Sequence, residues 1–297
     1  MSYQLSPDTP SAQPLSELDV MDGMRLFRVA RPAVGPARGA LLFCHGFAEH
    51  SGRYLAMAEG LAAQGYHCFL FDFRGHGRSE GRRGHVFAFD EYIRDFNAAR
   101  QWARAEIGDL PLFVLAHSNG ALVALHAVAR DPSGLAGVVF SSPFWGFALK
   151  VPKLKVLAAR QLSRFLPALG IPTGLDATFV SHDPEVVRLY ASDPLVTHVA
   201  SGRWFTETEA AHARAPDAAR MLQLPVLVQV GGDDRIASSP IARTVFEELG
   251  SADRTFQEYG GFYHEIWFEL DRVRPISAVA AWLEAHLPAA STDQDPQ

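Results

Sequence analysis

The chain of 297 residues is poor in cysteine and has no long apolar run. Its two cysteines, Cys44 and Cys68, cannot build the disulfide framework of a small secreted domain, and their apolar neighbours indicate buried side chains. No apolar run approaches the roughly 18 residues of a membrane-spanning helix. The first residues also lack the charged and then apolar order of a signal peptide. We therefore expect a cytoplasmic protein.

Positive charge is scarce as well. Lysine and arginine number 27 against 33 acidic residues, for a net charge of −6. This balance argues against a nucleic-acid partner, because phosphate binding needs a basic face. No histidine pair has the spacing of a metal site such as HExxH. The segment Gly75–Glu80 lacks the third glycine of a dinucleotide fingerprint. We expect neither a metal nor another cofactor.

Short apolar runs alternate with helical patterns along the chain, and hydrophobic residues make up 48% of it. The apolar runs are Ala40–Cys44, Cys68–Asp72, Leu112–Ala116, Gly137–Ser141 and Val226–Val230. The helical patterns are Arg53–Gln64, Phe89–Ile107, Gly120–Arg130, Pro240–Leu249 and Pro275–His286. Continuous apolar runs are typical of strands buried on both faces, as in parallel sheets covered by helices. The alternation predicts an α/β fold with a mostly parallel central sheet.

The alternation stops once, which predicts an insertion. Between residues 144 and 221 the sequence shows proline-punctuated helical pieces and no buried-strand run. We therefore predict a core of residues 19–143 and 222–288 with a helical insertion of residues 144–221. The ends, residues 1–18 and 289–297, are polar and lack periodicity, so we expect flexible tails.

One strand end carries the pattern of a serine nucleophile. The run Leu112–Ala116 leads through His117 to Ser118, and a helical pattern begins at Gly120. A serine at a tight turn between strand and helix is the context of the nucleophile elbow, whose flanking positions are small. Ala116 stands where that motif has its first glycine, which adds one methyl group. The alternative is a serine in an ordinary turn.

A base and an acid follow in the chain order that this kind of sheet requires. Asp233 and Asp234 come directly after the strand at residues 226–230, and His264 follows another strand candidate at residues 255–259. We prefer Asp234 as the acid, while Asp233 is suited to cap the turn. The order Ser118, Asp234, His264 predicts a catalytic triad.

An oxyanion formed at Ser118 needs two backbone N–H donors. The residue after the nucleophile, Asn119, supplies one. The loop after the first predicted strand supplies the other, and Phe47 is our candidate. His45 in the same loop is suited to stabilising the turn.

Five motifs together resemble the monoacylglycerol lipase and lysophospholipase group of α/β-hydrolases. They are HGFAEHSGRY from residue 45, FDFRGHGRSEGRRG from 71, HSNG from 117, GDDRI from 232 and GFYH from 261. The resemblance covers about residues 20–288. It implies an α/β-hydrolase fold with the insertion as a cap, or lid, over an acyl pocket, and it implies the triad and oxyanion donors named above.

The resemblance also implies where the polar end of the pocket lies. The residues that match Glu49 and Arg53 lie near the glycerol end of the pocket in relatives that cleave monoacylglycerols. Some relatives have a second histidine three residues beyond the catalytic one, where this chain has Trp267. This departure concerns glycerol recognition and leaves ester hydrolysis untouched.

The insertion contains all three lysines of the chain, Lys150, Lys153 and Lys155, just before an amphipathic pattern. Its apolar members are Leu154, Leu157, Leu162, Phe165, Leu166 and Leu169. A basic amphipathic helix is suited to an anionic lipid surface. The alternative is that its apolar face packs on the hydrolase core.

These observations predict a serine carboxylester hydrolase that cleaves lipid-like esters such as monoacylglycerols or lysophospholipids, without a cofactor. Two alternatives stay open. The same residues suit an esterase for small or aryl esters or an amidase, since the fold does not choose among them. A ligand-binding protein that keeps the fold without turnover is the other. Oligomeric state cannot be read from the sequence.

Overall fold

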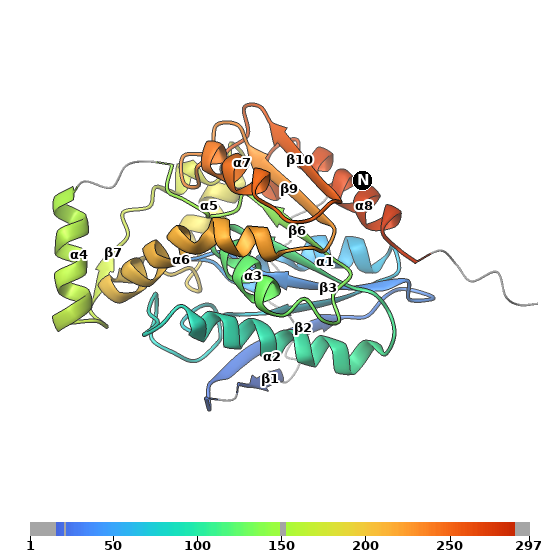
Figure 1. Ribbon diagram of the computed structural model, residues 1–297, viewed down its shortest axis with the longest axis horizontal. Coiled ribbons are helices and arrows are strands. Elements are labelled where there is room, and N and C mark those ends of the chain that lie inside the picture. The colour runs from blue at the N-terminus through green and yellow to red at the C-terminus, as the bar shows by residue number, and fades with distance from the viewer. Residues whose placement is uncertain (1–15, 21, 149–152, 289–297) are drawn as a thin grey trace, which may run out of the picture.

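The apolar runs of the sequence form neighbouring strands of one sheet. The computed structural model describes residues 16–20, 22–148 and 153–288 and orders the strands β1-β2-β4-β3-β5-β6-β9-β10 (Figure 1). The strands span Ser16–Asp19 (β1), Arg25–Arg31 (β2), Gly39–Cys44 (β3), Tyr66–Phe71 (β4), Leu112–His117 (β5), Gly137–Ser141 (β6), Val226–Gly231 (β9) and Arg254–Tyr259 (β10). β2 is antiparallel to β1 and β4, and the pairs from β4 through β10 are parallel. The predicted α/β fold with a mostly parallel sheet is confirmed.

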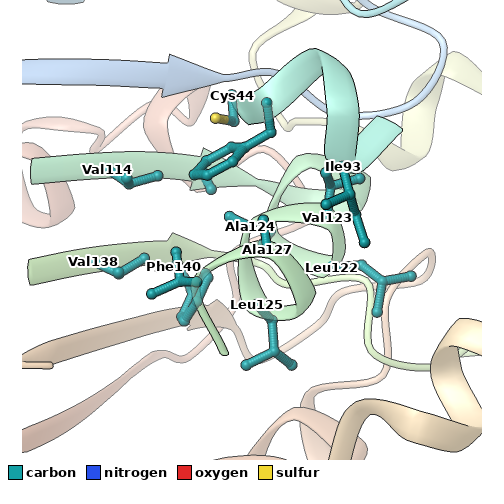
Figure 2. Close-up of a cluster of buried hydrophobic side chains, with 14 of the residues drawn as sticks. Cys44, Ile93, Val114, Leu122, Val123, Ala124, Leu125, Ala127, Val138 and Phe140 are labelled. Atoms are coloured by element: carbon teal, nitrogen blue, oxygen red, sulfur yellow. The ribbon is translucent and has the colours of Figure 1, made fainter. Parts of the chain in front are cut away.

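Helices cover both faces of this sheet, because successive residues of its strands point to opposite sides. One face carries α2 (Asp90–Ile107), α3 (Ser118–Arg130), α6 (Gly202–Met221) and α7 (Ser239–Glu247), and the other carries α1 (Leu55–Ala62) and α8 (Val273–Ala285). Leu42 packs into the first cluster and its neighbour Leu41 into the second. Figure 2 shows the first cluster, where Val114 and Phe140 of the sheet lie beside α3.

The structure corrects two predicted boundaries. Residues 16–18 belong to β1, so the predicted tail of residues 1–18 is wrong for these three; residues 1–15 and 289–297 lie outside the described residues. Pairing with β2, whose Leu26 is fully buried, accounts for this strand. The predicted helix over residues 53–64 starts later. A 3-10 turn, Ser51–Tyr54 (η1), precedes α1, and the His50 side chain caps it by accepting from the Gly52 N–H.

The segment between β6 and β9 contains more than the predicted helical pieces. It includes α4 (Lys153–Phe165), β7 (Gly170–Pro172), η2 (Ala177–Phe179), α5 (Pro184–Ser192), β8 (Val199–Ser201) and α6. β7 and β8 form a small antiparallel pair. α6 packs on α3, and α4 packs on α6 at the end of the molecule away from the sheet (Figure 1). A Cβ at Gly202 would lie 2.8 Å from the carbonyl oxygen of Ala159, so glycine permits this close helix contact.

Several apolar residues in and just after α4 face outward. Leu154 is 78% exposed and Phe165 68%, and Leu157 and Leu166 are also exposed. The alternative that this face packs on the core is therefore wrong for these residues, because α4 contacts α6 through other positions such as Ser163, whose hydroxyl bonds Thr206 at 2.8 Å. Lys150 and the side chains of Lys153 and Lys155 lie outside the described residues. None of the described helices is long and apolar enough to cross a bilayer.

Candidate active site

Ser118 lies at a strained turn between β5 and α3. Its φ is +51°, in the left-handed region that side chains rarely adopt. The helix that follows approaches the end of β3 very closely, because a Cβ at Gly120 would lie 2.4 Å from the carbonyl oxygens of Cys44 and His45. Ala116, at the position where the motif has glycine, is fully buried in β5. The turn thus presents the Ser118 hydroxyl at the carboxyl edge of the sheet.

The structure brings the three predicted triad residues into one hydrogen-bonded chain. Nε2 of His264 accepts from the Ser118 hydroxyl at 2.9 Å, and its Nδ1–H donates to Oδ2 of Asp234 at 2.7 Å. Oδ1 of Asp234 accepts from the backbone N–H groups of Ile236 and Ala237 at 2.8 and 2.9 Å, which fixes the carboxylate. The structure therefore places Asp234 against the histidine.

His264 is buried, and burial by itself lowers the pKa of an imidazole. The charge and hydrogen bond of Asp234 outweigh burial, so the pKa of His264 is raised above its ordinary value. A raised pKa means that the protonated imidazole is stabilised. This is the property that a general base needs when it takes a proton from a serine hydroxyl.

The loop that carries Phe47 is held rigidly beside Ser118. Nε2 of His45 accepts from the Phe73 N–H at 2.9 Å, so its Nδ1–H donates to the Gly46 carbonyl at 2.7 Å. Within the described residues, the backbone N–H groups of Phe47 and Asn119 form no hydrogen bond. Asn119 lies in the first turn of α3, where backbone N–H groups have no partner within the helix. Both donors are available for an oxyanion, and His45 stabilises the turn as expected.

The Phe47 side chain connects this loop to the insertion. Its ring centre lies 3.9 Å from that of Trp204 in α6, and its edge contacts His76 with ring centres 5.2 Å apart. The position of the Phe47 backbone therefore depends on where α6 packs.

Glu49 and Arg53 lie in a buried charge cluster that has a third member. Nη1 of Arg53 bonds Glu49 at 2.9 Å, and the guanidinium also binds both oxygens of Glu265 at 2.5 and 2.6 Å. Burial opposes ionisation of Glu49, but the neighbouring His117 and Arg53 outweigh burial and lower its pKa. The pKa of Glu265 is raised, because burial outweighs Arg53. Glu265 was not among the residues predicted from the sequence. Its position between His264 and the apolar residues 266–268 could have indicated a buried carboxylate near the active site.

Trp267 is buried in the core and does not face the active-site cavity. It belongs to a 3-10 turn, Ile266–Phe268 (η3), and is 3% exposed. Its indole N–H donates to Oε1 of Gln229 in β9 at 3.0 Å. The residue therefore packs in the core, and it is absent from the described lining of the cavity above Ser118.

A cavity of about 520 Å³ opens over Ser118 and His264. One part of its wall is apolar and comes from Phe144, Phe147, Ala159, Ile171, Trp204 and Phe205. The other part carries the polar residues Glu49, Asp176, Tyr190, Arg235 and Glu265, with apolar residues such as Leu175, Phe179 and Ile236 near them in the chain. Arg53 sits behind Glu49 and Glu265 and does not itself belong to the described lining. A volume in this range suits a small organic ligand, and the two-sided wall suits one that is amphipathic.

The parallel sheet and the serine held at its strained strand–helix turn define an α/β-hydrolase of the serine type. A family model described as "Serine aminopeptidase, S33" matches residues 35–271, and the chain belongs to this family.

Curated relatives span nearly the same length. The chain is 34% identical over 275 residues to a monoacylglycerol lipase of Mycolicibacterium smegmatis, which covers 89% of this chain and 95% of that protein. It is 32% identical over 252 residues to phospholipase YtpA of Bacillus subtilis, covering 83% and 95%. The resemblance to the monoacylglycerol lipase and lysophospholipase group is confirmed.

Solved structures agree with this assignment. The crystal structure of Paleococcus ferrophilus monoacylglycerol lipase superposes with a TM-score of 0.80 at 34% identity, covering 88% of this chain and 99% of that one. A monoglyceride lipase variant from Saccharomyces cerevisiae has a TM-score of 0.84 at 24% identity, covering 95% and 99%, and shows the shared fold.

Proposed function

We propose that this chain is a serine carboxylester hydrolase that cleaves lipid-like esters, with monoacylglycerols and lysophospholipids as its substrate classes. The observation that carries the proposal is the hydrogen-bonded chain from Ser118 through His264 to Asp234. Ser118 and His264 line a cavity whose wall has both apolar and polar residues. The named activities of the two curated relatives, a monoacylglycerol lipase and a phospholipase, support this substrate class.

The mechanism follows from the roles of these groups. Nε2 of His264 takes the proton of the Ser118 hydroxyl while Oγ attacks the ester carbonyl. The N–H groups of Phe47 and Asn119 stabilise the oxyanion of the tetrahedral intermediate. His264 then donates its proton to the leaving alcohol, and an acyl-enzyme remains. Water, deprotonated by His264, attacks this acyl group and releases the fatty acid. Asp234 holds the histidine tautomer and stabilises its charged form throughout.

The insertion of residues 144–221 serves as the cap in this proposal. Its residues Ala159, Ile171, Trp204 and Phe205 supply much of the apolar wall on which an acyl chain would lie. The exposed apolar residues of α4 support peripheral contact with a lipid surface, from which such a substrate would enter. We place the protein in the cytoplasm, which is supported by the two buried free thiols of Cys44 and Cys68.

Hydrolysis of a matched substrate panel tests the proposal. The panel contains a monoacylglycerol, a lysophospholipid with the same acyl chain, and a short p-nitrophenyl ester, and a fluorophosphonate probe reports the reactive serine. Ser118→Ala should abolish turnover and labelling. Ser142→Ala is the matched control, because Ser142 is also buried with a left-handed φ of +41° but does not line the described cavity. Turnover that persists in Ser118→Ala, or a preference for the aryl ester, contradicts the proposal.

A further inference from the structure

The proposed reaction defines the side of the cavity on which a head group lies. His264 donates its proton to the leaving alcohol, so whatever is attached to that oxygen lies on the His264 side of Ser118. Glu265 and Arg235 of the polar part of the lining are on this side, because Glu265 follows His264 directly and Arg235 follows Asp234, whose carboxylate binds His264. The apolar wall, with Phe147 and Phe205, is left for the acyl chain.

Arg235 is the cation of this polar wall. It follows Asp234 directly, its side chain is exposed, and it lines the same cavity as Ser118. Its guanidinium carbon lies 4.8 Å from the ring centre of Tyr263 and 5.3 Å from that of Phe179. Two aromatic faces hold the guanidinium in place, and such an arrangement leaves its N–H edge free for hydrogen bonds while reducing the entropy lost on binding.

The carboxylates of the described lining have other partners. Glu49 and Glu265 share the guanidinium of Arg53. Oδ1 of Asp176 accepts from the backbone N–H and the hydroxyl of Thr178 at 2.9 and 2.8 Å. Within the part of the chain that the structure describes, Arg235 forms no ion pair at 4 Å or less. Together with the Thr178 bonds, its charge helps to lower the pKa of the Asp176 carboxyl, but no described carboxylate lies within 4 Å of it, so the guanidinium can still contact a ligand directly.

We propose that Arg235 binds the phosphate of a lysophospholipid substrate and so favours this lipid class over monoacylglycerols; the proposal rests on the function proposed above. The glycerol hydroxyl next to the ester would face the buried oxygens of Glu49 and Glu265, which accept hydrogen bonds. The phosphate is attached further from the ester, and so it reaches the more exposed Arg235. A guanidinium matches phosphate through paired, charge-assisted hydrogen bonds. A monoacylglycerol has no anionic group to pair with this charge.

The test compares two substrates with the same decanoyl chain, monodecanoylglycerol and decanoyl-lysophosphatidylglycerol, below their micelle concentrations. The measured quantity is the ratio of kcat/KM for the phospholipid to kcat/KM for the monoacylglycerol. Arg235→Gln should lower this ratio about tenfold, mainly by raising KM for the phospholipid, as expected from the loss of one charge-assisted contact. Arg235→Lys should keep part of the ratio, because a point charge attracts phosphate without the paired geometry.

Arg243→Gln is the matched control. Arg243 is also an arginine stacked on an aromatic ring, 4.0 Å from the ring centre of Phe256, but it pairs with Glu258 and does not line the described cavity. It should leave the ratio at the wild-type value. An unchanged ratio in Arg235→Gln overturns the role of Arg235 and leaves the proposed function standing. Wild-type protein that cleaves the monoacylglycerol but not the phospholipid overturns the role of Arg235 and removes lysophospholipids from the proposed substrates, while lipid-ester hydrolysis at Ser118 stands. Wild-type protein that cleaves neither lipid refutes the proposed function itself.

Discussion

Replacing Arg53 by methionine should destabilise the protein strongly, because this guanidinium compensates two buried carboxylates. Glu265 would lose both of its side-chain hydrogen bonds, whereas Glu49 would keep those from the Gly46 N–H and the Tyr54 hydroxyl. Removing one partner of a buried ion pair costs about 3–5 kcal/mol. Methionine keeps apolar contact with Tyr190 and Phe268, on whose rings the guanidinium now lies. We therefore expect a loss of this size in the free energy of unfolding.

The loss should depend on pH in a defined direction. The pKa of Glu265 is already raised in the folded protein, and without Arg53 it rises further because burial and the negative charge of Glu49 both raise it. The folded variant then binds more protons than the unfolded chain, so its stability increases as the pH falls toward the pKa of folded Glu265. The deficit relative to wild type should be smaller at about pH 5 than at about pH 8, by up to about 1.4 kcal/mol per pH unit.

Urea unfolding at both pH values measures this effect. Arg188→Met is the control, because Arg188 pairs with Glu185 at the exposed surface, where such a pair contributes about 1 kcal/mol or less. Arg53→Met combined with Glu265→Gln should regain part of the stability, since no unpaired carboxylate is left at that position. A loss below about 1 kcal/mol in Arg53→Met, or a deficit that does not change with pH, would refute the reasoning.

Two further predictions concern the triad and the insertion. Asp234→Asn should lower kcat by about 10⁴-fold and move the acidic limb of the pH–rate profile to lower pH, because His264 loses the carboxylate that raises its pKa. Asp233→Asn is the control, since Asp233 is the neighbour of the residue that binds the histidine. An equal effect of both substitutions would exclude Asp234 as the acid. Phe165→Ser should reduce the amount of protein that floats with anionic vesicles more than Leu270→Ser does, because both side chains are exposed but only Phe165 lies on α4. Equal vesicle binding by the two variants would contradict membrane contact through α4.

The local part of the fold could be predicted from the sequence. Strands buried on both faces, such as β5 and β9, are continuous apolar runs, and their ends fix where Ser118 and Asp234 lie. β2 was missed because it lies toward the edge of the sheet, where Arg25, Arg28 and Arg31 interrupt the apolar pattern.

Long-range contacts could not be predicted in the same way. Arg53 and Glu265 are 212 residues apart, and nothing in either segment specifies the other as its partner. The periodicity of α4 shows an apolar face, but which surface that face meets depends on how α4 packs on α6. The resemblance indicated the polar end of the pocket through Glu49 and Arg53, and the structure adds Glu265 and Arg235 to it.

The packing of α6 has a consequence for protein engineering. Ala211, Ala215 and Ala219 of α6 are fully buried in the same hydrophobic cluster as the sheet, while Trp204 contacts Phe47. A chimera that exchanges residues 144–221 for the insertion of a relative would also replace this part of the core. Grafts that aim to change acyl-chain preference are better joined ahead of Gly202, so that α6 stays with the sheet for which its buried face is shaped.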